Sequence, residues 1–144
     1  MSRLIRPQPA FREREQLLQA VAGALRAGAC RSLPEDESRD VLAFTALALE
    51  ALQGSVEATA AAWEKREYWL KADRFRAQWA WLGDCHHDLA GCLARRDWSG
   101  AAEVAARLVT HLAGVRGTRR PSRAQPWLGA WETWQARELH ARSS

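Results

Sequence analysis

A chain of 144 residues, of which 47% are hydrophobic and 26% charged, is long enough to bury one hydrophobic core and too short for two full domains. Its formal net charge is +4, and no uninterrupted apolar run approaches the roughly 20 residues of a membrane span. The first residues lack a secretory signal and three cysteines are too few for a disulfide framework, so we expect a cytoplasmic protein without a transmembrane segment.

Residue usage favours helices over strands. Alanine, leucine, arginine and glutamate are common, whereas isoleucine occurs once and valine and threonine are sparse; the first group favours helix and the second strand. We therefore predict an all-α fold, an antiparallel bundle of about four helices with one long central helix and a short Trp-rich C-terminal helix. Residues 1–114 would form the bundle, 115–126 a basic flexible linker and 127–144 the C-terminal helix.

The first helix is predicted over residues 11–29. Apolar side chains recur there at Leu17, Leu18, Val21 and Leu25. This is the spacing of an amphipathic helix with one face toward a core.

A second helix is predicted to follow the stretch SLPEDE. Ser32 can cap this helix, Glu35 stands three positions later as in a capping box, and the acidic cluster favours the positive end of the helix dipole. We expect the helix to cover about residues 33–52, because Gly54 and Ser55 supply a breaker and a new cap.

A third helix would start at Ser55 and meet no strong breaker before Asp97, apart from Gly83. About 40 residues at 1.5 Å per residue make a helix of about 60 Å, so we expect either a long straight helix or a kink near Gly83. A fourth helix is predicted from a cap at Asp97 or Ser99 to a terminator at Gly114.

The last segment combines a basic linker with a tryptophan stripe. Residues 115–126 are rich in Gly, Pro, Ser and Arg, and Trp127, Trp131 and Trp134 follow at i, i+4 and i+7. Three roles stay open for this helix. It folds back on the bundle, it inserts into the groove of a partner protein, or it makes a peripheral contact with a membrane surface.

The stretch WEKREYWLKADRFRAQWAW, residues 63–81, is apolar on two faces when it is drawn as a helix. One seam is predicted to face the core and comprises Tyr68, Ala72, Phe75, Trp79, Leu82, His86, Leu89 and Leu93. The opposite row comprises Trp63, Leu70, Ala77 and Trp81. This second row must also be covered, either by the chain's own helices or by a partner, for which Trp is a frequent anchor.

Basic side chains alternate with aromatic ones in the same stretch, as they do in proteins that bind single-stranded nucleic acids. Acidic side chains offset much of this charge, Glu67 and Lys71 have the spacing of a salt bridge, and Arg76 can stack on Trp69. Nucleic-acid binding is therefore the alternative function. It would use Arg66 and Arg74 and, in the linker, Arg119, Arg120 and Arg123.

No catalytic or metal-binding site is predicted. The run GDCHHDLAGC, residues 83–92, contains zinc-ligand residue types, but a helix spreads Cys85, His86, His87 and Cys92 over several directions, whereas a metal needs converging ligands. P-loop, dinucleotide-binding, serine-hydrolase and zinc-protease motifs are missing from the sequence. We therefore expect no cofactor and no enzymatic activity.

The pattern Tyr-Trp-Leu-Lys-Ala-Asp-Arg-Phe-Arg, with further Trp residues on both sides, resembles small uncharacterised helical proteins of cyanobacteria. The resemblance covers residues 63–81 only. It implies no activity and favours a non-enzymatic accessory protein.

These observations together favour a protein–protein interaction module, an adaptor or assembly factor. Its partner would be another protein or a larger complex, or a second copy in a homodimer. The predicted partner-binding residues are Trp63, Arg66, Leu70, Arg74, Trp81, Trp127, Trp131 and Trp134.

Overall fold

The computed structural model describes residues 9–30, 33–114 and 125–143, and every regular element in these ranges is a helix. The predicted all-α class is confirmed for this part of the chain. The helices are α1 (Pro9–Cys30), α2 (Glu35–Lys65), α3 (Trp69–Gln78), α4 (Ala80–Ala94), α5 (Trp98–His111) and α6 (Ala130–Ser143). Residues 115–124 of the predicted linker lie outside the described ranges.

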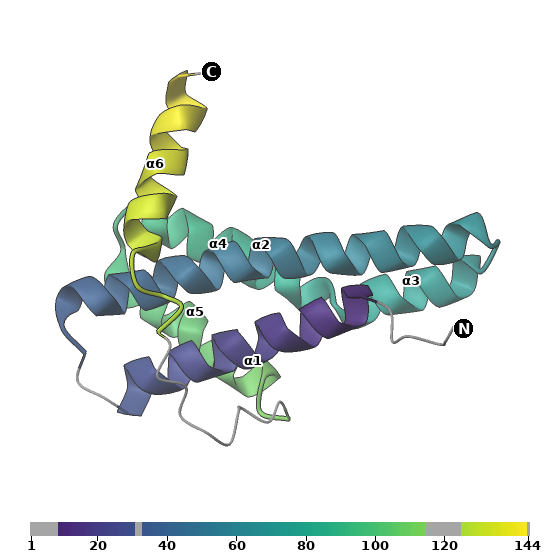
Figure 1. Ribbon diagram of the computed structural model, residues 1–144, viewed down its shortest axis with the longest axis horizontal. Coiled ribbons are helices and arrows are strands. Elements are labelled where there is room, and N and C mark those ends of the chain that lie inside the picture. The colour runs from purple at the N-terminus through teal and green to yellow at the C-terminus, as the bar shows by residue number, and fades with distance from the viewer. Residues whose placement is uncertain (1–8, 31–32, 115–124, 144) are drawn as a thin grey trace, which may run out of the picture.

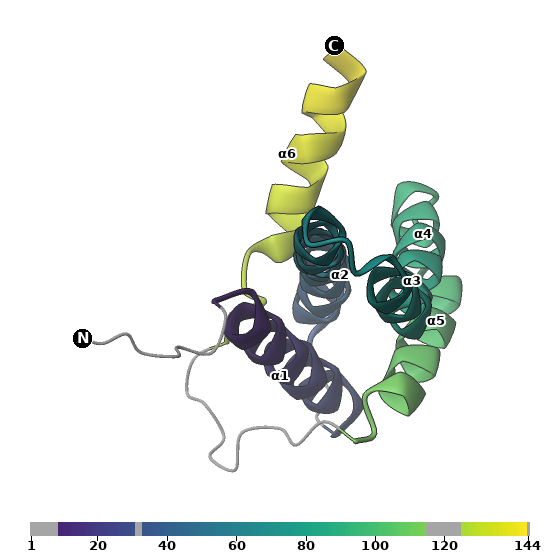
Figure 2. The same ribbon diagram turned by 90° about the vertical axis from the view of Figure 1, so that its right-hand side faces the viewer.

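Helix α2 is the central element of the fold (Figures 1 and 2). It has 31 residues, which corresponds to about 46 Å, and it contacts α1, α3, α4 and α6. Helix α1 runs antiparallel to it on one side, and α3 and α4 return along the other side with α5 beyond them (Figure 2). A long central helix was predicted, but over residues 55 to about 97 and not over this segment.

The predicted break at Gly54 and Ser55 is wrong, because α2 continues through both residues. Ser55 does not cap a new helix; its Oγ accepts a hydrogen bond of 3.0 Å from the Arg14 guanidinium of α1. Val56 and Ala60 are buried in the turns that follow. Tertiary packing therefore outweighs the low helix propensity of one glycine–serine pair.

The predicted continuous third helix is also wrong, because the chain turns after Lys65. Glu67 has a φ of 66°, and the Tyr68 N–H donates to the Trp63 carbonyl at 2.9 Å. A residue in this left-handed region cannot continue an α-helix. Helix α3 therefore begins at Trp69 and runs back along α2.

A second interruption lies at Trp79, four residues before the predicted kink at Gly83. The Trp79 N–H is shared between the carbonyls of Phe75 and Arg76, at 3.2 Å each. The Trp79 indole lies between the rings of Phe75 and Trp81, with centroids 6.3 and 6.0 Å away. Gly83 itself is an ordinary residue within α4.

The core lies where α2 meets α1, α4 and α5. Of the seam predicted from residues 63–93, Ala72, Leu82, Leu89 and Leu93 are buried as expected, whereas Tyr68 is exposed. The largest fully buried side chains are Val21, Thr45, Leu49, Leu52, Leu82, Leu89, Leu93 and Leu108. The predicted cap at Asp97 is confirmed, since its carboxylate accepts the Gly100 N–H at 2.9 Å.

Helix α2 is long and apolar enough to cross a membrane by length and composition alone. Half of the apolar stretch that meets this criterion is buried inside the fold. A helix that is covered by α1, α3, α4 and α6 has to be apolar on several faces, so its composition agrees with its central position.

Candidate docking surface

The three C-terminal tryptophans belong mainly to the fold's own packing. Trp127 is buried, Trp131 and Trp134 are partly buried, and all three pack on the core cluster. The Trp131 ring makes an edge contact with the Trp98 ring at 5.1 Å between centroids. Their predicted role in partner binding stays a prediction, and the packing shows only that these indoles are largely covered by the fold. Of the three roles left open for this segment, its tryptophans take the first and dock on the bundle.

The start of α6 is capped by a distant aspartate. The Asp40 carboxylate on α2 accepts the Gly129 N–H at 3.2 Å and the Trp131 N–H at 3.0 Å. These are two of the N–H groups that a helix start leaves without internal partners. Asp40 therefore fixes the position of α6, and no local sequence signal could have indicated a cap 89 to 91 residues away.

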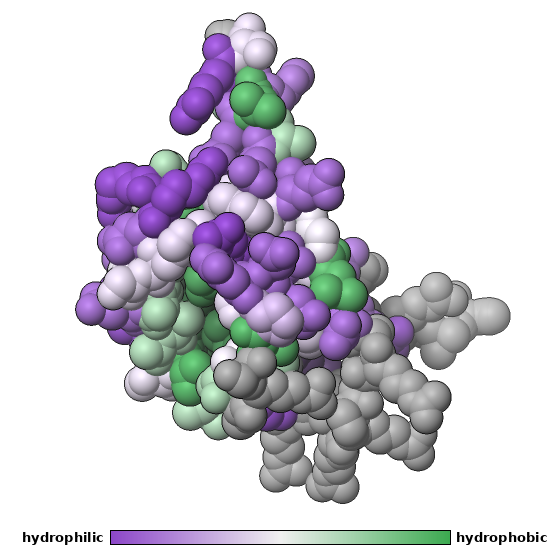
Figure 3. All heavy atoms as spheres, turned by 90° about the vertical axis from the view of Figure 1, so that its left-hand side faces the viewer, coloured by the Kyte–Doolittle hydropathy of each residue, from purple (hydrophilic) through white to green (hydrophobic). Residues whose placement is uncertain are grey.

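Two arginines complete the attachment of α6. Arg96 pairs with Glu138 at 3.0 Å and lies over the Trp131 ring at 4.6 Å. Arg137 pairs with Glu50 at 2.9 Å and lies 5.8 Å from the Trp134 ring centre. Beyond these contacts α6 projects from the bundle (Figure 1). Figure 3, which faces the end where α2 begins, shows hydrophilic side chains gathered over its upper part and a mixture with hydrophobic ones below.

Trp81 is separated from the other members of its predicted row. Because the chain is interrupted at Trp79, Trp81 lies on α4, where its ring stacks on His111 with centroids 4.5 Å apart and planes 3° from parallel. Trp63 and Leu70 remain together at the turn between α2 and α3. The structure therefore corrects the prediction of one surface containing all three residues.

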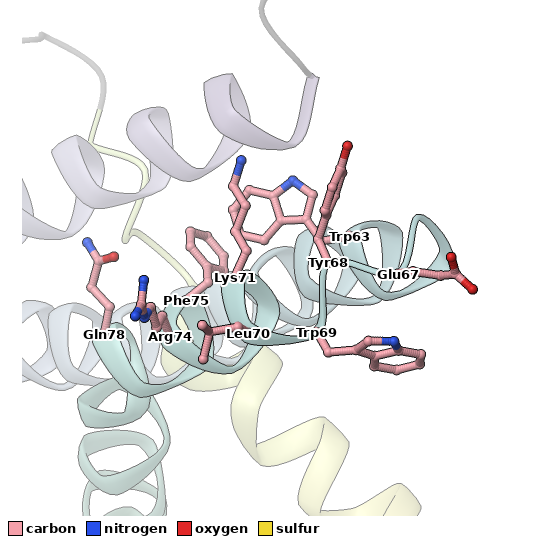
Figure 4. Close-up of a pocket in the computed structure, with 9 residues that line it drawn as sticks. All are labelled: Trp63, Glu67, Tyr68, Trp69, Leu70, Lys71, Arg74, Phe75 and Gln78. Atoms are coloured by element: carbon pink, nitrogen blue, oxygen red, sulfur yellow. The ribbon is translucent and has the colours of Figure 1, made fainter.

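The turn between α2 and α3 displays consecutive large side chains to solvent. Tyr68, Trp69 and Leu70 are exposed by 54%, 58% and 63%. Figure 4 has Trp63, Tyr68 and Lys71 pointing to one side of the turn, with Trp69 directed away from them. We call Trp63, Tyr68, Trp69 and Leu70 the aromatic tip.

A hollow of about 630 Å³ opens at the aromatic tip. Trp63 and Phe75 are the partly buried aromatic residues in it, and their rings meet nearly at right angles with centroids 4.9 Å apart. The Lys71 ammonium lies 4.6 Å from the Trp63 ring centre. The lining residues are Trp63, Glu67, Tyr68, Trp69, Leu70, Lys71, Arg74, Phe75 and Gln78.

A buried arginine supports this hollow from inside the fold. Arg14 is only 6% exposed, donates hydrogen bonds to Ser55 and to Thr59 at 3.0 and 3.2 Å, and lies 5.1 Å from the Phe75 ring centre. Burial lowers the pKa of Arg14. These contacts tie α1, α2 and Phe75 of α3 together, so the hollow rests on a fixed base.

Acidic side chains near the tip are drawn to Arg76 and away from the hollow. The Arg76 guanidinium makes paired hydrogen bonds to Glu57, at 2.7 and 3.0 Å, and to Glu64, at 2.8 and 2.9 Å. These bonds lower the pKa of both carboxyl groups and raise that of Arg76. The predicted stacking of Arg76 on Trp69 is replaced by this double ion pair.

The predicted Glu67–Lys71 pair is also replaced. Glu67 lies in the turn before α3, outside helical geometry, and the Lys71 ammonium contacts the Trp63 ring. Within the described ranges, no ion pair engages the side chains of Lys65, Arg66, Lys71 or Arg74. The hollow therefore combines an apolar floor with Lys71 and Arg74, two basic groups that form no ion pair with the described residues.

A second hollow, about 1120 Å³ in volume, lies along α4 and is mainly bordered by polar residues. Asp88 there pairs with Arg107 at 2.7 Å. The His86 Nε2 lies 4.0 Å from Glu50, and burial outweighs that carboxylate and lowers the His86 pKa. Within the described ranges, no three His, Cys, Asp or Glu side chains gather as metal ligands. This hollow brings together no recognisable catalytic arrangement.

Cys85 and Cys92 are buried free thiols, and burial raises the pKa of Cys85. Both cysteines therefore pack as small apolar side chains.

Comparison with known proteins gives no match: no family model, no curated protein and no solved structure matches this chain. Of the residues named for nucleic-acid binding, Arg119, Arg120 and Arg123 lie outside the described ranges.

Proposed function

We propose that this protein is a non-enzymatic interaction module, an adaptor or assembly factor that binds a partner protein through the aromatic tip. The observation that carries the proposal is the run Tyr68-Trp69-Leu70, three adjacent large side chains left exposed beside a hollow with an aromatic floor. Large apolar side chains gathered and exposed at one place on a folded domain commonly mark an interaction site.

The composition of the tip supports protein recognition. Trp, Tyr and Arg are the residues that most often dominate interface energies, and they act when they become buried against a partner. Covering about 100 Å² of apolar surface contributes about 2.5 kcal/mol before the costs of association. Because Arg14 and the Trp63–Phe75 contact already hold the floor in place, little of that energy is lost in ordering it.

The proposed interface is smaller than the set of residues named from the sequence. Trp63, Leu70 and Arg74 line the hollow, and Arg66 lies in the adjoining turn. Trp81, Trp127, Trp131 and Trp134 serve internal contacts. The frame beneath the tip is then an antiparallel bundle of α1, α2, the interrupted α3–α4 arm and α5.

We further propose that the protein works in the cytoplasm.

A capture experiment with two matched leucine variants tests this function. Leu70 and Leu139 are 63% and 65% exposed, but Leu70 lies at the tip and Leu139 in the second half of α6. Tagged wild type, Leu70→Ala and Leu139→Ala are used to capture proteins from nuclease-treated native lysate. A photoreactive phenylalanine analogue in place of Tyr68 then maps what touches the tip.

We expect one stoichiometric protein that cross-links to position 68 and is lost with Leu70→Ala but retained with Leu139→Ala. Equal capture by both variants, or no cross-link from position 68, contradicts the proposal. Capture that vanishes on nuclease treatment would instead support the nucleic-acid alternative. Cross-links between copies of this chain would show that the partner is a second copy in a homodimer and not a different protein.

A further inference from the structure

We propose that the segment bound at the aromatic tip is an acidic amphipathic helix of the partner protein. This inference rests on the proposed docking function and specifies its ligand. Three features carry it: the distribution of charge around α3, the spacing of the residues that line the hollow, and the shape of its floor.

Arg76 gathers the acidic side chains near the tip. The carboxylates of Glu57 and Glu64 are hydrogen-bonded to Arg76, and Asp73 lies 4.0 Å from it. With Arg76 these three acids carry a net charge of −2, and none of the four residues lines the hollow. These acids are not available to the basic residues of the hollow.

The remaining charges at the tip are mostly positive. Lys65 and Arg66 end α2 and enter the turn, while Lys71 and Arg74 line the hollow. Glu67 is the acid that lines the hollow with them, so these five groups carry four positive charges and one negative charge. The lining groups Glu67, Lys71 and Arg74 sum to +1, and Lys65 and Arg66 in the adjoining turn raise this to +3. With the Arg76 cluster included the region still carries a net +1, and positive charge beside an apolar floor favours a ligand that is both acidic and apolar.

The lining residues follow one face of α3. Leu70, Lys71, Arg74, Phe75 and Gln78 line the hollow and have the i, i+4 and i+8 spacing of a helical ridge. The helix has 10 residues and is therefore about 15 Å long. This length matches two to three turns of a second helix, whose apolar residues at i, i+3 or i+4 and i+7 would meet the hollow.

The floor discriminates between ligands. The Trp63–Phe75 pair and Leu70 offer apolar surface within a concavity, which suits inserted aliphatic side chains better than a phosphate backbone. A second copy of the tip would bring the same positive charges face to face, and like charges in contact oppose binding. Anionic lipid shares the charge but presents a flat surface instead of a ridge.

Fluorescent peptides of about 15 residues provide the probes, since they span the length of α3 with a margin at both ends. One peptide places leucines at i, i+3, i+4 and i+7 and glutamates at the other positions. A second keeps the leucines and replaces every glutamate with glutamine. Binding is followed by fluorescence anisotropy, with phosphatidylserine vesicles and a single-stranded oligonucleotide tested in parallel.

The acidic peptide is expected to bind about tenfold more tightly than the glutamine peptide, and its affinity should fall as salt screens the basic groups. Arg74→Glu should weaken its binding by a similar factor, whereas Arg142→Glu on α6 should not. Leu70→Ala should weaken both peptides, and Leu139→Ala neither. Far-ultraviolet circular dichroism and the Tm confirm that each variant is folded.

Four results overturn the inference. The two peptides bind equally, Arg74→Glu is no weaker than Arg142→Glu, no peptide binds, or only vesicles or the oligonucleotide bind. If the cross-linked protein of the capture experiment still depends on Leu70 in any of these cases, the docking function stands and only the acidic-helix ligand fails. If that dependence is lost as well, both proposals fail together.

Discussion

Aromatic side chains are covered at one end of α2 and exposed at the other. Toward its start, the indoles of Trp131 and Trp134 pack on the core and are flanked by Arg96 and Arg137. At its other end Trp69 is 58% exposed. One central helix therefore supports a packed, ion-paired cluster at one end and an uncovered surface at the other.

The arginines differ between the two ends as well. Arg96 and Arg137 pair with carboxylates of their own chain, as Arg76 does on the inner side of α3. Arg74 lines the hollow without such a pair among the described residues. The number of Trp and Arg residues alone therefore does not locate a docking surface. What distinguishes the two ends is whether the chain's own residues already cover the indoles and pair the arginines.

The largest expected effect comes from the part of α2 that supports both ends. Leu52 is fully buried in the core, so Leu52→Ala should lower the free energy of unfolding by about 2–5 kcal/mol through lost burial and a residual cavity. Chemical denaturation measures this change. Ala51→Gly, at an exposed neighbour on the same helix, should cost only about 1 kcal/mol. Equal losses would contradict the assignment of Leu52 to the core.

Removing the Asp40 carboxylate should weaken only the end of α2 on which α6 packs. Asp40→Ala leaves the Gly129 and Trp131 N–H groups without their cap and should cost about 0.5–2 kcal/mol. Hydrogen exchange should accelerate in α6 before it changes in α3. Asp84→Ala, at an exposed position of α4, is the control and should stay within about 0.5 kcal/mol. Unchanged exchange in α6 would show that Asp40 does not hold it.

Acidification should weaken the fold in part through His86. Burial lowers the folded pKa of His86 below the ordinary value of 6.5. The Glu50 carboxylate acts in the opposite direction, whereas the positive charges of Arg137 and His87 lower the pKa further. The neutral form of His86 therefore contributes stability above pH 6.5, and this contribution is lost as the pH falls from there toward the folded pKa. His86→Gln should flatten the decline of Tm between pH 7.5 and 5.5, and a parallel decline in both proteins would reject this account.

The smallest effect on stability is expected at the aromatic tip. Leu70→Ala exchanges one exposed side chain for another, so the free energy of unfolding should change by no more than about 0.5 kcal/mol. Denaturation of this variant beside Leu139→Ala measures the difference. A loss comparable to that of Leu52→Ala would place Leu70 in the core and remove the proposed docking surface.

The fold class and one helix cap could be predicted from the sequence. The helical composition and the cap at Asp97 act over short distances, and both predictions are confirmed. The continuity of α2 could not be predicted, because Arg14 engages Ser55 across 41 positions of the chain. The turn at Glu67 was also hidden, since a non-glycine residue with positive φ leaves no reliable sequence signal.

The candidate site was predicted only in part. Trp63, Leu70 and Arg74 do gather, but Tyr68 was assigned to the core and Trp81 to the same surface as Trp63. Both errors follow from drawing one helix through a segment that contains two interruptions. The local signal that was available is the run Tyr68-Trp69-Leu70 itself, because consecutive large side chains cannot all face one side of a helix.

The most direct test of the docking surface compares two variants, Leu70→Ala and Leu139→Ala, at equal concentrations of folded protein. The measurement is the ratio of the amounts they capture of the partner that cross-links to position 68. The two leucines match in exposure and differ in location, so the ratio isolates the tip from general surface hydrophobicity. We predict that Leu70→Ala retains about a tenth or less, the effect of an interface residue worth about 1.4 kcal/mol. A ratio near one would contradict the account.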